Sequence, residues 1–397
     1  MLKNKTVILG VTGSIAAYKI ANLASMLVKQ HCDVHVIMTQ NATHFINPIT
    51  FETLTNNKCL VETFDRNFQF HVAHVSLAQK ADVMLIAPAS ANIIGKLAHG
   101  IADDMLSTTA LACTVPILVS PAMNTRMYEN PIVQDNLEIL KKYGMTVIDP
   151  AVGMLACRDV GAGKMPSEEL LMEYILKTIA CPKDLFGKKI LITAGPTRET
   201  IDPVRFISNR STGKMGYAIA KRAMLRGAEV TLVTGPTGLP KPSFVNVIEI
   251  ETAREMYEAV VEQFPTQDII IKSAAVADYK PSHVSDEKIK KTEGDMSIPL
   301  ERTQDILSYL GQHKKKEQFI CGFSMETQNM VENSKLKLEK KNADMIVANN
   351  LKDSGAGFGT DTNIVTIITK ENVSELPIMS KEEVADAVLD RIILECV

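Results

Sequence analysis

Short apolar runs alternate with amphipathic stretches along the whole chain. The apolar runs are Thr6–Leu9, Val34–Met38, Val83–Ala87, Ile117–Val119 and Thr146–Ile148, then Lys189–Thr193, Glu229–Val233, Asp268–Lys272, Phe319–Phe323 and Met345–Ala348. Stretches with helical spacing lie between them, such as Ile15–Gln30 and Ser167–Thr178. Strands that alternate with helices form parallel sheets covered by helices. The pattern therefore predicts an α/β protein with two Rossmann-like domains.

A segment with Pro and Gly, Cys181–Gly187, separates the two sets of runs. Both sets open alike, with an apolar run, a Gly-containing turn and a helical stretch. The length of 397 residues exceeds that of one ordinary hydrophobic core. We therefore expect one domain at residues 1–186 and a second at 187–397.

Composition narrows the class of protein. The chain is 46% hydrophobic and 22% charged, with a formal net charge of -3, which is typical of a globular protein without a nucleic-acid or anionic-membrane partner. The seven cysteines form no CxxC pair, which indicates a reducing compartment. The first residues lack a signal-peptide pattern, and no apolar run has the length of a membrane span. We expect a cytoplasmic protein.

Three loops of the first half follow predicted strands. They carry Gly13 and Ser14, Thr39, and Ser90 with Asn92. Ligands of parallel sheets bind at the carboxyl ends of strands, with phosphates at helix N-termini. A simple tight turn explains the first loop equally well. Three such loops, each directly after a predicted strand, favour a binding site.

A further loop of the first half contains residue types suited to flavin chemistry. Asn124 lies between Met123 and Met127, where an amide beside thioethers suits a planar apolar ligand with one carboxylate. Cys157 lies in a Gly-rich segment and supplies a thiol. His74, or His71 one turn earlier, would titrate near neutrality, although a single histidine is more often a helix cap or a surface residue.

These motifs together, from Gly10–Lys19 to Gly153–Met165, resemble the flavin-containing cysteine decarboxylases, and most closely those that act on phosphopantothenoylcysteine. The resemblance covers residues 1 to about 180. It implies a flavodoxin-like domain that binds FMN between the subunits of a trimer. The flavin of that family oxidises the substrate thiol to a thioaldehyde, after which carbon dioxide leaves. By matched position, His74 assists oxidation or decarboxylation, Asn124 binds the carboxylate and Cys157 donates a proton.

The second half has its own candidate binding loops. Ser211–Lys214 precedes a helix and offers donors to phosphate oxygens, although it is not a P-loop and a solvated loop is an alternative. Asp278 follows an apolar strand and could bind a divalent ion or a ribose, or cap a helix. The basic run Lys288–Lys291 is either a solvated surface or a triphosphate contact.

Residues 187 to 397 resemble phosphopantothenate–cysteine ligases, above all in Gly195–Gly216. The resemblance implies CTP with Mg²⁺ or Mn²⁺, attack of the 4′-phosphopantothenate carboxylate on CTP, and capture of the acyl-cytidylate by cysteine. Asn209 would act on the acyl-cytidylate, Lys288 on the triphosphate, and Asp278 on the nucleotide or metal. The remaining positions of the implied nucleotide pocket are Ala274, Ala275, Gln304, Asp305, Ile306, Leu307, Phe323, Lys337 and Lys341.

The fused pair of domains is typical of bifunctional enzymes of coenzyme A synthesis. The family implies homo-oligomers with trimeric decarboxylase and dimeric ligase contacts, which together could build a dodecamer. Two alternatives remain. A non-catalytic regulatory subunit is disfavoured because His74, Asn124 and Cys157 are all present. An NAD(P)-dependent oxidoreductase is disfavoured because neither half has the Gly-x-Gly-x-x-Gly fingerprint.

Overall fold

The computed structural model describes residues 2–64, 73–154, 160–290, 296–326, 329–350 and 359–396. Its contacts divide the chain into two compact units, Met1–Pro182 and Lys183–Val397. The division lies inside the predicted linker but earlier than the expected boundary at 186/187. The reason is that Leu185 donates its N–H to the carbonyl of Arg226, 3.0 Å away, so that this part of the linker belongs to the second unit.

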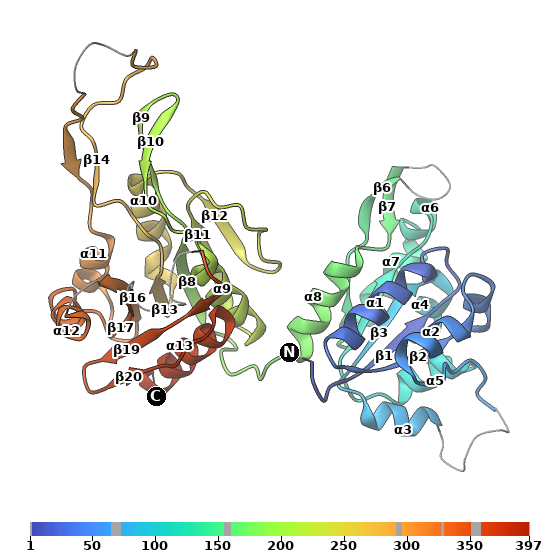
Figure 1. The fold of residues 1–397 in the computed structure, drawn as a ribbon. Coiled ribbons are helices and arrows are strands. Elements are labelled where there is room, and N and C mark those ends of the chain that lie inside the picture. Colours follow the sequence, from blue (N-terminus) through green and yellow to red (C-terminus); the bar gives the residue numbers. More distant parts are fainter. Residues whose placement is uncertain are drawn as a thin grey trace. The chain divides into compact units, whose positions relative to one another are not determined.

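The first unit is a five-stranded parallel sheet with helices on both faces (Figure 1). Its elements are β1 (Thr6–Val11), α1 (Ala17–Lys29), β2 (Asp33–Met38), η1 (Gln40–His44), α2 (Pro48–Thr55), α3 (Ala73–Lys80), β3 (Val83–Ala89), α4 (Ala91–Ala98), α5 (Met105–Ala112), β4 (Ile117–Pro121), α6 (Thr125–Tyr128), α7 (Pro131–Lys142), β5 (Thr146–Val147), β6 (Ala151–Met154), β7 (Val160–Lys164) and α8 (Glu168–Ile179). The strand order β2-β1-β3-β4-β5 is that of flavodoxin-like folds, as predicted.

Local chemistry explains the elements of this unit. Every residue of β1 and β3 is buried, because a parallel strand covered on both faces has no solvent side. Helix α8 starts after Ser167, whose hydroxyl accepts a hydrogen bond from the Leu170 N–H, and its first turn carries two glutamates. β6 and β7 form an antiparallel ribbon outside the main sheet, which the alternating pattern does not reveal.

The second unit has an eight-stranded sheet. Its elements are β8 (Lys189–Ala194), β9 (Arg198–Asp202), β10 (Arg205–Ser208), α9 (Lys214–Leu225), β11 (Glu229–Thr234), β12 (Asn246–Glu249), α10 (Ala253–Gln263), η2 (Phe264–Thr266), β13 (Ile269–Lys272), β14 (Tyr279–Pro281), β15 (Leu300–Arg302), α11 (Ile306–His313), β16 (Phe319–Glu326), α12 (Met330–Lys340), β17 (Met345–Asn350), β18 (Thr362–Asn363), β19 (Val365–Thr369), β20 (Val373–Glu375), β21 (Met379–Ser380) and α13 (Lys381–Glu395).

Six parallel strands of this sheet have the order β12-β11-β8-β13-β16-β17, which is the classical Rossmann order. The predicted parallel sheet is confirmed, and the structure adds β19 and β20, which are antiparallel, at one edge. Mixed sheets of this kind place their antiparallel strands at an edge. None of the helices within the described ranges is both long and apolar enough to cross a membrane.

Candidate active sites

The predicted residues of the first unit lie along one edge of its sheet. Thr39 follows β2, Ser14 follows β1, Ser90 follows β3, and Asn124 follows β4. These strands are consecutive in the sheet, so the four loops form a row at its carboxyl edge. The chain order reverses between β1 and β3. This is the switch point at which ligands of doubly wound sheets bind.

Hydrogen bonds hold the loops on both sides of this switch point together. The Thr12 hydroxyl donates to the Pro88 carbonyl oxygen at 2.6 Å and accepts from the Ser90 N–H at 3.0 Å. The predicted residues Gly13 and Ser14 come directly after Thr12, and Asn92 lies in the first turn of α4 after Ser90. The two loops are therefore fixed before any ligand binds.

Three buried hydroxyls near this edge, those of Thr39, Ser120 and Thr125, have no hydrogen-bond partner among the described residues. Thr39 follows β2, Ser120 lies at the end of β4, and Thr125 begins α6. Buried hydroxyls normally have partners, so these atoms fit a ligand with polar groups on its edge. A flavin has such an edge, and the residues at this site therefore fit that cofactor.

Asn124 sits at the N-terminal end of α6, where its side-chain oxygen accepts a hydrogen bond from the Arg126 N–H at 2.9 Å. The neighbouring Met123 N–H donates to the carbonyl oxygen of Gly163 in β7 at 3.0 Å. The β6–β7 ribbon is thus attached to the Asn124 loop. The predicted proton donor Cys157 lies between these strands and outside the described residues.

His74 is partly buried near the start of α3. Figure 1 shows α3 and α6 at different ends of the first unit, with the sheet between them. A single chain therefore does not bring His74 to Asn124. His71 lies outside the described residues, and the role of either histidine stays a prediction.

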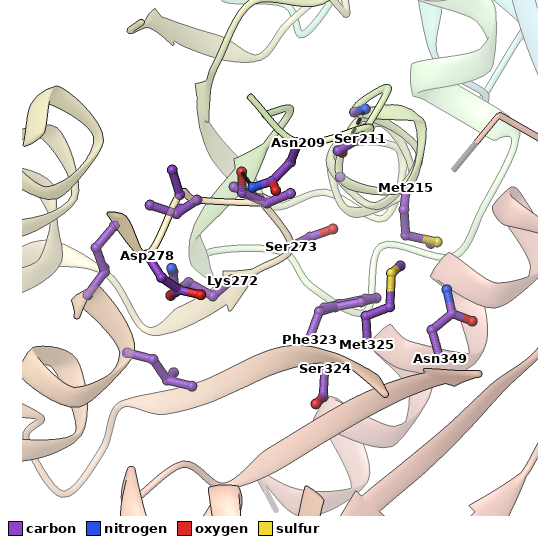
Figure 2. Close-up of a pocket in the computed structure, with 18 of the residues that line it drawn as sticks. Asn209, Ser211, Met215, Lys272, Ser273, Asp278, Phe323, Ser324, Met325 and Asn349 are labelled. Atoms are coloured by element: carbon purple, nitrogen blue, oxygen red, sulfur yellow. Dashed lines mark hydrogen bonds between the residues drawn. The ribbon is translucent and has the colours of Figure 1, made fainter. Parts of the chain in front are cut away.

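The second unit has a cavity of about 750 Å³ at its own switch point, which lies between β8 and β13. Figure 2 shows side chains from loops after β10 and β13, from α9, and from β16 and β17 gathered around it. Of the predicted residues, the lining includes Asn209, Ala274, Ala275, Asp278, Gln304, Asp305, Ile306, Leu307, Phe323, Lys337 and Lys341.

Lys288 is predicted to contact the triphosphate, but it is not among the residues that line the cavity. It is exposed, on a segment held at Ile289, whose N–H donates to the Asp202 carboxylate at 3.2 Å. In a single chain, this segment packs against the β9–β10 hairpin instead. The role of Lys288 stays a prediction.

The cavity loop 273–278 is held in place by its neighbours. The Asn209 side-chain N–H donates to the Ala275 carbonyl oxygen at 3.0 Å. The Ala277 N–H donates to the Thr197 hydroxyl at 3.0 Å, and the Thr303 hydroxyl donates to the Ala277 carbonyl oxygen at 2.6 Å. Asn209 therefore reaches the backbone of the predicted nucleotide loop directly.

Charged side chains from α11 and α12 meet on one side of the cavity. Lys341 forms an ion pair of 2.5 Å with Asp305, which caps α11 by accepting from the Ser308 N–H. Burial alone would raise the pKa of Asp305, but the hydrogen bond from Lys341 and the Ser308 N–H outweigh it, and the pKa is lowered. Lys337 donates to the Phe323 carbonyl oxygen at 3.2 Å.

The described residues provide only part of the metal site that is predicted at Asp278. Within the described ranges, no three His, Cys, Asp or Glu side chains are grouped as metal ligands. Mg²⁺ often binds through one or two carboxylates together with substrate phosphates. Asp278 and Asp305, which both line the cavity, fit a metal ion that enters with a triphosphate.

Several lining residues are not among the site residues predicted from the sequence. Lys272 ends β13, Asn349 lies in β17, Asn363 in β18, and Lys381 begins α13. Lys272 had a local signal, because a lysine directly follows three isoleucines in a buried strand. The other three come from distant segments, so no local pattern marks them.

Comparisons with known proteins agree with this division. Residues 1–180 match the Flavoprotein family, and residues 185–395 match the family described as DNA/pantothenate metabolism flavoprotein C-terminal domain. The coenzyme A biosynthesis bifunctional protein CoaBC of Bacillus subtilis is 48% identical over 396 residues, covering 99% of this chain and 97% of the relative. The CoaBC of Borreliella burgdorferi is 44% identical over 391 residues, covering 98% of this chain and 99% of that protein.

Among solved structures, the C-terminal domain of a CoaBC protein is 48% identical, with a TM-score of 0.46, and the match covers 53% of this chain and 97% of that one. The curated relatives, by contrast, match along both units and over nearly their whole lengths. The chain belongs to the family of coenzyme A biosynthesis bifunctional proteins CoaBC.

Proposed function

We propose that the second unit joins cysteine to 4′-phosphopantothenate at the expense of CTP, and that the first unit decarboxylates the product to 4′-phosphopantetheine. The observation that carries the proposal is that each unit presents most of its predicted site residues at the carboxyl edge of its sheet, beside the switch point. The relatives are bifunctional along the same length of chain. One unit's product would be the other unit's substrate.

In the ligase unit, the substrate carboxylate attacks the α-phosphorus of CTP and pyrophosphate leaves. The cysteine amine then attacks the carbonyl carbon of the acyl-cytidylate, and CMP leaves. Asn209 would act on the acyl-cytidylate, and the hydrogen bond from its amide to the Ala275 carbonyl in the cavity lining supports this role. Asp278 and Asp305 would bind Mg²⁺ or Mn²⁺ together with the triphosphate.

In the decarboxylase unit, FMN would occupy the row of loops that contains Ser14, Thr39 and Ser90. A bound flavin supplies the electron acceptor that amino-acid side chains lack. Asn124 would hold the substrate carboxylate, and the Cys157 thiol would be the proton donor. His74 would act on the same substrate from a neighbouring subunit, since its own chain leaves it remote from Asn124.

Assembly is part of this proposal. Trimeric contacts between first units would complete the flavin site, and dimeric contacts between second units would complete the ligase site with Lys288. Both kinds of contact in one chain could build a dodecamer. The substrates are small molecules, and the expected location is the cytoplasm.

A test separates the two activities in one preparation. The wild-type protein should be yellow, with flavin absorbance, and should release pyrophosphate and carbon dioxide when given 4′-phosphopantothenate, cysteine and CTP. Asn209→Asp should block the formation of phosphopantothenoylcysteine, while added phosphopantothenoylcysteine is still decarboxylated. Cys157→Ser should allow ligation but stall the first unit before 4′-phosphopantetheine forms, with an oxidised or ene-thiol species accumulating. A colourless protein that does not take up FMN would contradict the decarboxylase proposal, and CTP-independent ligation would contradict the ligase proposal.

A further inference from the structure

Lys272 occupies a central position in the second unit. It is the last residue of β13, the strand on one side of the switch point, and it lines the cavity. Its partners in the sheet are Thr193 of β8 and Gly322 of β16. Figure 2 shows Lys272 on the same side of the cavity as Asp278.

The charges around Lys272 come from three other segments. Asp278 lies on the loop after β13, Asp305 precedes α11, and Lys337 and Lys341 lie on α12 or directly after it. Lys341 already forms an ion pair with Asp305. At this end of the cavity, three lysines therefore face two carboxylates, and one of these carboxylates is already paired.

Lys272 makes no hydrogen bond or ion pair with the residues that the structure describes. Ammonium groups removed from water normally have a partner, because burying an unpaired charge costs free energy. Burial lowers the pKa of Lys272 to about 8, Lys337 acts in the same direction, and Asp305 and Asp278 oppose them. An anionic ligand would stabilise the charged form of a lysine in this environment.

We infer that the Lys272 ammonium binds a phosphate group of a substrate in the cavity. This inference rests on the proposed ligase function, whose two anionic substrates, CTP and 4′-phosphopantothenate, both carry phosphate. A phosphate oxygen would give Lys272 the partner that the protein does not provide. Lys272 thereby holds the phosphate-bearing substrate in the cavity that Asn209 also lines.

The test is isothermal titration calorimetry on the full-length protein in the presence of Mg²⁺. Wild-type protein, Lys272→Met and Lys272→Arg are each titrated with CTP, with 4′-phosphopantothenate, and with pantothenate, which lacks the phosphate. Loss of a hydrogen bond to a charged group corresponds to about a 10- to 100-fold weaker affinity. We expect a loss of this size in Lys272→Met for CTP or for 4′-phosphopantothenate, with partial recovery in Lys272→Arg.

The ligand whose affinity falls in Lys272→Met is the one that carries the phosphate bound by Lys272. Weaker binding of CTP assigns Lys272 to the nucleotide, and weaker binding of 4′-phosphopantothenate with pantothenate unchanged assigns it to the other substrate. Lys340→Met is the matched control, since Lys340 is an exposed lysine of α12 that does not line the cavity. It removes the same charge, and we expect affinities within about twofold of wild type.

Melting temperatures exclude a merely structural role. Removing an unpaired, partly buried charge should leave the melting temperature of the free protein equal or higher, while ligand binding weakens. Unchanged affinity for both phosphorylated ligands would overturn the inference. So would an equal loss for all three ligands with a lower melting temperature, because that result indicates a folding defect. If the wild-type protein binds neither CTP nor 4′-phosphopantothenate, the proposed ligase function itself fails.

Discussion

Gly163 and Met123 are joined backbone to backbone: the Met123 N–H donates to the Gly163 carbonyl oxygen at 3.0 Å. Gly163 has a φ of +126°, and a Cβ added to it would overlap the carbonyl oxygen of Met123. This contact attaches the β6–β7 ribbon to the loop that presents Asn124. Only glycine satisfies both the backbone conformation and the close approach.

Gly163→Ala should therefore separate the ribbon from the Asn124 loop. Strain of this kind costs about 1 to 3 kcal/mol, and the overlap adds to it. We expect decarboxylation of phosphopantothenoylcysteine to fall at least about 10-fold, while pyrophosphate release by the ligase unit is retained. Gly144→Ala is the control, because Gly144 has a φ of +84° with open space around it. Equal losses in both variants would show that backbone strain alone, and not the Met123 contact, matters.

Asn349 lines the cavity, and its buried side-chain oxygen has no hydrogen-bond partner among the described residues (Figure 2). Asn349→Leu, of similar volume, should relieve about 1 to 3 kcal/mol of unsatisfied polarity and raise the melting temperature of the free protein. The further rise caused by CTP with 4′-phosphopantothenate should shrink. Both changes can be followed by differential scanning fluorimetry.

The control for this variant is Gln267→Leu, since Gln267 also buries an unpartnered amide oxygen but does not line the cavity. It should leave the ligand-induced rise at the wild-type value. A full ligand-induced rise in Asn349→Leu would mean that the cavity ligands do not use this amide.

Arg226 connects the start of the second unit to its last helix. It is 6% exposed and forms ion pairs of 2.6 Å with both Asp184 and Asp390. Arg226→Met should remove about 2 kcal/mol from the second unit. For a domain of this size, the thermal inactivation of ligase activity should shift down by about 4 to 8 °C, with decarboxylase activity unaffected.

Arg254→Met provides the comparison for Arg226. Arg254 pairs with Glu258 on the exposed surface of α10, and surface pairs of this type contribute little. The temperature at which Arg254→Met loses ligase activity should equal that of the wild-type protein. A similar shift in the two variants would contradict a special role for the buried guanidinium.

Asp33 gives the first unit a pH-dependent contribution to stability. Burial alone would raise the pKa of Asp33, but hydrogen bonds from Lys80, Asn57 and His35 outweigh it and lower the pKa to about 2. The pKa of an unfolded aspartate is about 3.9. The carboxyl group therefore ionises more readily in the folded state than in the unfolded state. Its ionised form stabilises the fold above pH 4, and this stabilisation disappears as the pH falls from about 4 to about 2.

Asp33→Asn should lower the melting temperature of the first unit at pH 5. The difference from wild type should shrink below about pH 4, measured by flavin fluorescence or circular dichroism. Asp135→Asn, on the exposed side of α7, should show no such pH-dependent difference. A constant difference down to pH 2 would contradict the assignment to the ionised Asp33 carboxylate.

Much of the site follows from the sequence because parallel sheets place their strand ends together. Thr39, Ser90 and Asn124 follow apolar runs, so their position at one edge was predictable without coordinates. Lys337 and Lys341 are one turn apart on or just after a helix, and both line the cavity. His74 and Lys288 were expected in the sites, yet one chain leaves His74 remote from Asn124 and Lys288 outside the cavity lining.

By itself, the sequence determined the two α/β units and most of the loops at their binding edges. A parallel strand that is buried on both faces must be apolar along its length, so each strand and the loop after it are visible in the sequence. Only the tertiary structure decided that Lys272, Asn349 and Lys381 line one cavity and that Gly163 supports the Asn124 loop. These residues come from strands and helices far apart in the chain. Their meeting depends on strand order and register, which local patterns of hydrophobic and polar residues do not encode.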